Sequence, residues 1–220
     1  MTTTSASAAN TTPRVTLRTL LAAGLVAGPL YTAVWLGQAA TREGFDITRH
    51  PASLLANGGP GWIQTANFVI AGILSIAAAV GLRRAIVGRG SRWAPRLVGA
   101  YGVGLLLAAI FPADPAAGFP AGTPADYAEI STRGMGHFVA GSIGFTGLIA
   151  ACLVMAAHYR STGRTGWARY STVTGVLFLG AFVGLMAGAG KPVTIIAFGV
   201  AIVLGWSWIA AICADHRRTT

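Results

Sequence analysis

Four side chains with the chemistry for proton transfer, cation binding or headgroup recognition stand near the ends of apolar runs. They are Asp46, His50, Asp114 and His137. Carboxylates accept hydrogen bonds and bind cations, while imidazoles donate, accept or titrate near neutral pH. The segments that hold the first three are rich in Gly and Pro, which is typical of loops. We predict that the four side chains form the polar floor of one pocket, roofed by two loops at a membrane surface.

A purely local interpretation of the same residues is open as well. In it Asp114 caps a turn, and His137 donates a hydrogen bond to a loop carbonyl without contributing to a pocket. Three arginines in or beside the same loops, Arg42, Arg49 and Arg133, would then contact phospholipid headgroups.

Two further polar residues, Gln64 and Asn67, fall inside an apolar run, near its outer end. Hydrogen bonding to a neighbouring helix explains them at least as well as a ligand does. The centres of the apolar runs hold no Asp, Glu, Lys, Arg or His. Ion-coupled carriers and proton pumps usually place such groups at membrane depth, so this absence disfavours a coupled transporter.

The sequence holds no recognised cofactor or metal signature. No nucleotide-binding loop, zinc motif or GxSxG element is present, and Cys152 and Cys213 are too far apart to form a CxxC pair. We therefore predict no cofactor, no metal and no assignable catalytic residue, and favour a protein that is not an enzyme.

The composition excludes a soluble globular protein. Of the 220 residues, 54% are hydrophobic and only 10% are charged, and the mean hydropathy is +0.62. The formal net charge of +10 would suggest nucleic acid as a partner in a soluble protein. Here the arginines stand in short segments between apolar runs, where they face anionic lipid headgroups. We predict membrane lipids as partners and no nucleic acid.

Six apolar runs indicate an all-α membrane bundle of six transmembrane helices. We place them at about 17–40, 62–82, 97–111, 134–158, 170–189 and 193–213. Together they form one transmembrane domain over residues 14–216, between a disordered cytoplasmic tail (1–13) and a short cytoplasmic tail (217–220). The third run is short for a membrane span of about 20 residues, so it must borrow residues from the segment before it.

The distribution of charge predicts that both termini are cytoplasmic. With the N-terminus inside, twelve of the sixteen basic residues fall on the inner side, whereas five of the six acidic residues fall on the outer side. Basic segments resist translocation, which is the reason for this preference. The two long loops, 41–61 and 112–133, then lie on the outer face, where we expect any function to reside.

Three glycines in the fifth run, Gly180, Gly184 and Gly188, repeat at every fourth position. Such a face lets helices approach closely, so we predict a central fifth helix that packs on this face. The sharper alternative is that the face forms a homo-oligomer interface.

The loop motifs resemble a bacterial membrane family catalogued as domain of unknown function 998. The resemblance rests on Gly44-Phe45-Asp46, His50-Pro51-Ala52-Ser53-Leu54 and Gly61-Trp62-Ile63-Gln64 in the first loop region. In the second region it rests on Phe111-Pro112-Ala113-Asp114-Pro115, Gly118-Phe119-Pro120 and Gly136-His137. The resemblance implies a multi-pass protein of the bacterial plasma (inner) membrane, but it implies no activity.

Three functions from different classes are compatible with these observations. The leading hypothesis is a non-enzymatic bundle that binds a lipid or another amphiphile at its outer face. The alternative is a metal-assisted hydrolase of the outer leaflet that uses His50, His137 and the loop carboxylates. The third is an uncoupled transporter of small molecules.

Overall fold

The computed structural model describes residues 15–88, 90–127, 129–188 and 190–218. The predicted tail at 1–13 and the final residues 219–220 lie outside this part of the chain. The helices are α1 (Leu17–Thr41), the 3-10 helix η1 (Ala52–Ala56), α2 (Gly61–Ala85), α3 (Trp93–Ile110), α4 (Thr132–Ser161), α5 (Thr165–Ala187) and α6 (Pro192–Arg218). Among the described residues, strand pairing is limited to one bridge between Ala116 and Phe119.

All six α-helices are long and apolar enough to cross a membrane, so the predicted fold class is confirmed. The chain is a multi-pass membrane protein. Helices satisfy their backbone hydrogen bonds internally, which is what a segment without access to water requires. Two of the starts are capped by side chains: the Thr16 hydroxyl accepts from the Thr19 amide at 3.2 Å, and the Ser131 hydroxyl accepts from the Gly134 amide at 3.1 Å.

The helices differ from their predicted bounds at several ends. α3 begins at Trp93 rather than at residue 97, and its 18 residues span about 27 Å at 1.5 Å per residue. α5 runs from Thr165 to Ala187 rather than over 170–189, and α6 continues to Arg218 instead of ending at 213. Counting only apolar residues misplaces these ends because helical hydrogen bonding continues through Arg and Trp into the headgroup region.

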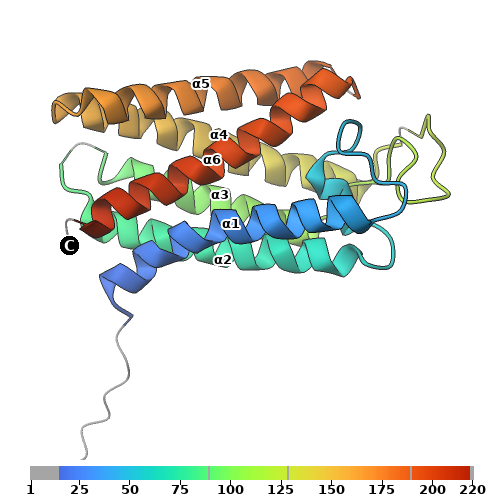
Figure 1. Ribbon diagram of the computed structural model, residues 1–220, viewed down its shortest axis with the longest axis horizontal. Helices are drawn as coiled ribbons and strands as arrows, with labels where there is room; N and C mark the ends of the chain where they lie inside the picture. Colours follow the sequence, from blue (N-terminus) through green and yellow to red (C-terminus); the bar gives the residue numbers. More distant parts are fainter. Residues whose placement is uncertain (1–14, 89, 128, 189, 219–220) are drawn as a thin grey trace, which may run out of the picture.

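The helices form a ring in which each one packs on the next along the chain, and α6 closes the ring against α1 (Figure 1). The start of α1 and the end of α6 lie at the same end of the bundle. We call this the basic end, and it carries Arg18, Arg83, Arg84, Arg92, Arg96, Arg160, Arg164, Arg169, Arg217 and Arg218. The opposite end, which we call the loop end, carries the two long loops, 42–60 and 111–131.

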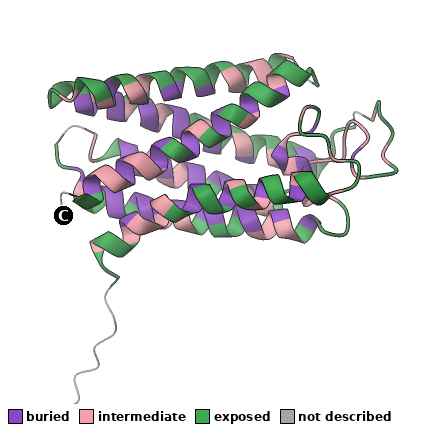
Figure 2. Cartoon of the chain, viewed as in Figure 1, coloured by how far each residue is buried: buried purple, intermediate pink, exposed green. Residues whose placement is uncertain are grey.

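Buried residues face the interior of the ring, and the outward faces of the helices are exposed (Figure 2). Tyr31, Tyr101 and Trp206 meet there, with the Trp206 ring 5.4 Å from that of Tyr31 and 5.1 Å from that of Tyr101. Their helices, α1, α3 and α6, are far apart in the chain. The aromatic contact therefore connects α1, α3 and α6 in the interior of the ring.

Close contacts between the backbones of neighbouring helices run through glycines of α2, α3 and α4. A Cβ placed on Gly102 would lie 2.7 Å from the carbonyl oxygen of Gly72. A Cβ on Gly104 would lie 2.6 Å from the Cα of Gly144 and 2.8 Å from the carbonyl oxygen of Ala140. Both are contacts with backbone, which cannot rotate away. These glycines set the separation of the helices, as small residues do in membrane bundles.

The prediction of a central fifth helix packed through Gly180, Gly184 and Gly188 is wrong. A Cβ on Gly180 meets nothing within 4 Å, and one on Gly184 only reaches Thr194 at 4.0 Å. Gly188 is close to Thr194 of α6 at its terminus. α5 instead lies at the edge of the bundle and packs through Gly175, where a Cβ would lie 3.0 Å from the Cβ of Cys152. Regular spacing identifies a helix face made of small residues, but it does not show whether a neighbouring helix packs on that face.

We therefore expect Gly175→Leu to destabilise the bundle more than Gly184→Leu, by about 1–3 kcal/mol, as overpacking does elsewhere. Thermal unfolding of the two variants in the same detergent checks this order. Equal unfolding temperatures would show that α5 packs on α4 less closely than these contacts indicate.

Candidate functional site

His50 joins the two long loops at the loop end. Its side chain is buried between the rings of Phe45 and Phe119, whose centroids lie 5.3 and 5.5 Å away. The Nδ1 atom accepts a hydrogen bond from the Asp46 amide at 2.9 Å, so the proton is on Nε2. Nε2 donates to the carbonyl oxygen of Ala117 at 3.1 Å. With both ring nitrogens engaged by backbone groups, His50 positions the loops and has no nitrogen left for a metal.

The same carbonyl oxygen of Ala117 accepts a second hydrogen bond, from Arg49 at 3.3 Å. Ala117 has a φ of 53°, in the left-handed region that a residue with a Cβ rarely adopts. The two donors from the first loop hold this conformation at the tip of the second loop. The second loop thus depends on the first for its shape.

Arg42 and Asn57 complete the contact between the loops. The Arg42 guanidinium donates to the carbonyl oxygens of Leu55 at 3.0 Å and Asn57 at 2.7 Å, and it lies 5.2 Å from the centre of the Phe119 ring. Partial burial lowers the pKa of Arg42. The Asn57 amide donates to the carbonyl oxygen of Ala113 at 3.0 Å. Sequence reasoning missed this role because a loop arginine and a headgroup-binding arginine look the same in a sequence.

Asp46 is exposed and lies in its own turn. Its carboxylate accepts hydrogen bonds from the amide and the hydroxyl of Thr48, at 2.8 and 2.7 Å. These bonds are the main cause that lowers the pKa of Asp46. The geometry is that of a residue that stabilises a tight turn.

Asp114 and His137 tie the second loop to the ends of α3 and α4. The Asp114 carboxylate accepts from the amide of Ser131 at 2.7 Å and from its hydroxyl at 2.6 Å. It therefore stands at the positive end of the α4 dipole, where an anion is favoured. The His137 Nδ1 atom lies 2.9 Å from the carbonyl oxygen of Phe111, to which it donates. Such contacts are what the purely local interpretation of the sequence predicts for Asp114 and His137.

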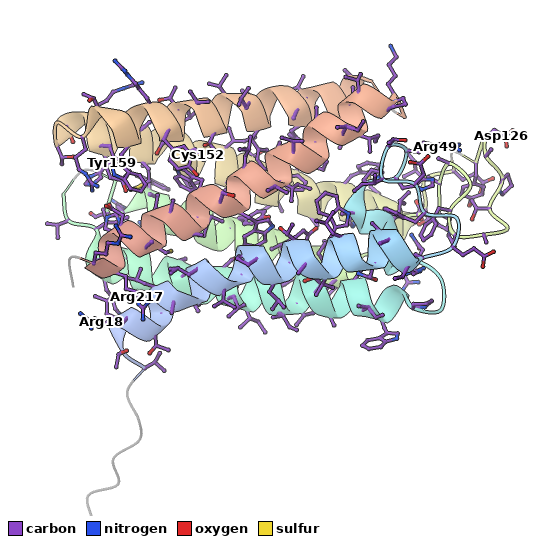
Figure 3. The ribbon with its side chains drawn as sticks, in the orientation of Figure 1. Arg18, Arg49, Asp126, Cys152, Tyr159 and Arg217 are labelled. Atoms are coloured by element: carbon purple, nitrogen blue, oxygen red, sulfur yellow. The ribbon has the colours of Figure 1, made fainter. Side chains whose placement is uncertain are left out.

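Asp114 and His137 nevertheless also line a cavity of about 470 Å³ in the loop-end half of the ring. Asp46 and His50 do not line it. Further polar lining groups at its mouth are Arg49, Tyr127 and Glu129. The structure thus brings two of the four predicted residues, together with Arg49, to one cavity. His50 lies instead at the contact between the two loops, and Asp46 lies in a turn of the first loop. Figure 3 labels Arg49 at this end, opposite Arg18 and Arg217.

The walls of this cavity are apolar. Its phenylalanine lining residues come from four helices and are Phe68, Phe138, Phe145, Phe182 and Phe198. Its tyrosine lining residues are Tyr31 of α1, Tyr101 of α3 and Tyr127 of the second loop. Phe138 of α4 and Met186 of α5 line the cavity and are also 45% and 53% exposed. The cavity therefore reaches the outer surface of the bundle beside these two helices.

Gln64 and Asn67 form a separate polar cluster between α1 and α2. The Gln64 Oε1 atom accepts hydrogen bonds from the side-chain amide of Gln38 at 2.8 Å and from that of Asn67 at 3.3 Å. The Asn67 side-chain amide also donates to the carbonyl oxygen of Tyr31 at 3.1 Å. The cluster is buried, which supports the interpretation of these residues as interhelical contacts. Gln38 was missed because its partner, Gln64, lies on another helix and 26 residues away in the sequence.

The site does not have the arrangement of a hydrolytic metal centre. In the part of the chain that the structure describes, no group of three or more His, Cys, Asp or Glu side chains is arranged to hold a metal ion. Both ring nitrogens of His50 are engaged with backbone groups, and the Asp114 carboxylate is engaged with Ser131. The geometry favours binding of an apolar group with a polar end.

Comparison with known proteins places the chain in a family without adding an activity. No curated protein and no solved structure is significantly similar to it. The model of the family described as Protein of unknown function (DUF998) matches residues 25–215, nearly the whole of the transmembrane bundle. On this match, and in agreement with the loop motifs, the chain belongs to the DUF998 family.

Proposed function

We propose that the protein binds a lipid or another amphiphile in the cavity at the loop end. The apolar chain of the ligand occupies the space between α3, α4, α5 and α6, and its polar head lies at the mouth, near Arg49, His137 and Glu129. The observation that carries the proposal is a cavity of about 470 Å³ with apolar walls and a charged mouth. This volume is within the range of about 300–1,000 Å³ that small-molecule sites occupy.

The route of entry supports an amphiphile over a water-soluble ligand. Phe138 and Met186 place an exposed apolar edge of the cavity among the outward faces of α4 and α5, which would lie against lipid tails. A chain that enters from the bilayer exchanges one apolar environment for another. The polar head keeps its contact with water at the membrane surface, so no charge needs to be buried.

We further propose that the loop end faces the outside of a bacterial plasma membrane. The concentration of arginines at the opposite end supports this orientation, because basic segments remain cytoplasmic. The ligand would then come from the outer leaflet.

Gly141→Leu tests the proposal by filling the cavity. Gly141 lines the cavity, and a Cβ there meets only the Phe145 ring, at 3.4 Å, so the leucine extends into open space. Gly180→Leu is the matched control, because it adds the same side chain to a helix glycine with nothing within 4 Å. Lipid that co-purifies in mild detergent is quantified by mass spectrometry, and binding of a fluorescent phospholipid is titrated.

We expect Gly141→Leu to weaken binding of the fluorescent phospholipid about tenfold, which corresponds to about 1.4 kcal/mol. Gly180→Leu should bind as the unaltered protein does. If the two variants retain lipid equally and bind the probe with equal affinity, the cavity is not the lipid site.

A further inference from the structure

A second site lies at the basic end, in a groove between the first turns of α1 and the last turns of α6. The groove has a volume of about 450 Å³ and is lined by Arg18, Leu25, Ala214, Arg217 and Arg218. In Figure 3, Arg18 and Arg217 lie at this end, beside the start of α1 and the end of α6. None of its lining residues belongs to the cavity at the loop end.

The groove forms where α1 and α6 separate. The two helices are in closest contact at Gly24, where an added Cβ would clash with the Sγ atom of Cys213. Leu25 and Ala214, the next residue in each helix, form the apolar lining of the groove. Towards the end of the bundle the lining changes to three arginines. The lining of the groove therefore combines arginine side chains with an apolar strip.

The lining of the groove contains no acidic residue. Asp215 is the single acidic residue at the basic end. Its carboxylate is taken by Arg164, which donates two hydrogen bonds to it, at 2.6 and 2.7 Å. Arginine is suited to hold phosphate because its planar guanidinium group offers paired donors.

We propose that this groove binds the phosphate of an anionic phospholipid, with Arg18 and Arg218 on either side and an acyl chain along Leu25 and Ala214. The ligand is a lipid rather than free phosphate because the groove combines guanidinium groups with an apolar strip. Basic pockets between transmembrane helices are the type of site in which acidic lipid headgroups are held. A lipid bound in this groove would contact both α1 and α6, the first and last helices of the ring.

The test compares two double variants that remove the same charge. Arg18→Gln/Arg218→Gln removes two of the three groove arginines, whereas Arg160→Gln/Arg169→Gln removes two exposed arginines of α4 and α5 at the same end but outside the groove. Each is made in the full chain, both in the unaltered background and with Gly141→Leu, so that binding in the loop-end cavity is measured separately. Delipidated protein in neutral detergent is titrated with phosphatidylglycerol, phosphatidylcholine or inorganic phosphate, and its thermal unfolding is followed.

In the Gly141→Leu background, we expect phosphatidylglycerol to raise the unfolding temperature, and phosphatidylcholine and inorganic phosphate to have little effect. The affinity of the groove variant for phosphatidylglycerol should be lower by about tenfold or more. The control variant should bind phosphatidylglycerol with unchanged affinity. If the groove variant does not fold, Arg18→Gln and Arg218→Gln are measured singly.

Three results would overturn the proposal. Equal weakening in both double variants would mean that the arginines act only through total charge. Equal stabilisation by inorganic phosphate would mean that the groove recognises a free anion. Equal stabilisation by phosphatidylcholine would mean that the negative charge of the headgroup is not recognised.

Discussion

Replacing Gly104 by leucine is expected to reduce the free energy of unfolding by about 3 kcal/mol or more, the upper end of what overpacking costs. A Cβ at this position lies 2.6 Å from the Cα of Gly144 and 2.8 Å from the carbonyl oxygen of Ala140. Both atoms belong to the α4 backbone, so the helices must move apart to admit the side chain. That separation also breaks packing elsewhere along α3, because the interior of the ring is continuous.

Gly99 provides the matched control within the same helix. A Cβ there would make only an ordinary contact, 3.7 Å from the Cβ of Ala79. We expect Gly104→Ala to destabilise the protein by about 1–2 kcal/mol, whereas Gly99→Ala should be neutral or slightly stabilising because alanine favours the helix. Chemical unfolding in detergent, followed by circular dichroism, gives the comparison. If Gly104→Ala proved as stable as Gly99→Ala, α3 and α4 would not be in backbone contact.

The second large effect is expected at the basic end, where Arg164 and Asp215 hold the turn between α4 and α5 against α6. The two hydrogen bonds between them are bidentate, and the Arg164 guanidinium lies 4.9 Å from the centre of the Tyr159 ring and 5.3 Å from that of Trp167. The Asp215 carboxylate raises the pKa of Arg164, which therefore stays charged. The side chain of Asp215 is only 15% exposed, and that of Arg164 is 39% exposed.

We expect Arg164→Ala to cost about 2 kcal/mol of unfolding free energy. This value lies between the cost of at most about 1 kcal/mol for an exposed ion pair and about 3–5 kcal/mol for breaking a buried one. Arg160→Ala, which removes an exposed arginine bonded to the Thr172 hydroxyl at 3.1 Å, should cost much less. A double-mutant cycle with Asp215→Ala separates the interaction energy from the loss of packing. A coupling energy near zero would show that the pair does not hold the helices together.

The sequence was sufficient to predict the helices because each apolar run is long enough to cross a bilayer by itself. It was not sufficient to identify the packing glycines. Gly180 and Gly184 have the regular spacing of every fourth residue, yet the close contacts occur at Gly102 and Gly104. These two glycines are not spaced as a known packing motif. The difference arises because a glycine matters only when a second backbone lies opposite it, and the position of that backbone depends on the whole ring.

The candidate site was predictable in part for the same reason. The depth of Asp114 and His137 follows from their positions beside helix ends, and both line the loop-end cavity. His50 has the same type of position in the sequence, but its Nδ1 atom is engaged by the Asp46 amide of its own loop and its Nε2 atom by Ala117 of the second loop. The local pattern around a loop histidine contains no information about which loop will cover it.

By itself the sequence determined that this protein is an all-helical bundle with six spans, an arginine-rich end and two long loops at the other end. These properties follow from hydropathy and charge, which act on each segment separately. Only the tertiary structure decided that the loops lock together through His50 and Arg42, that α5 lies at the edge, and that a cavity and a basic groove occupy opposite ends. Each of these depends on contacts between segments that are distant in the chain, and such contacts are determined by how the side chains pack in three dimensions.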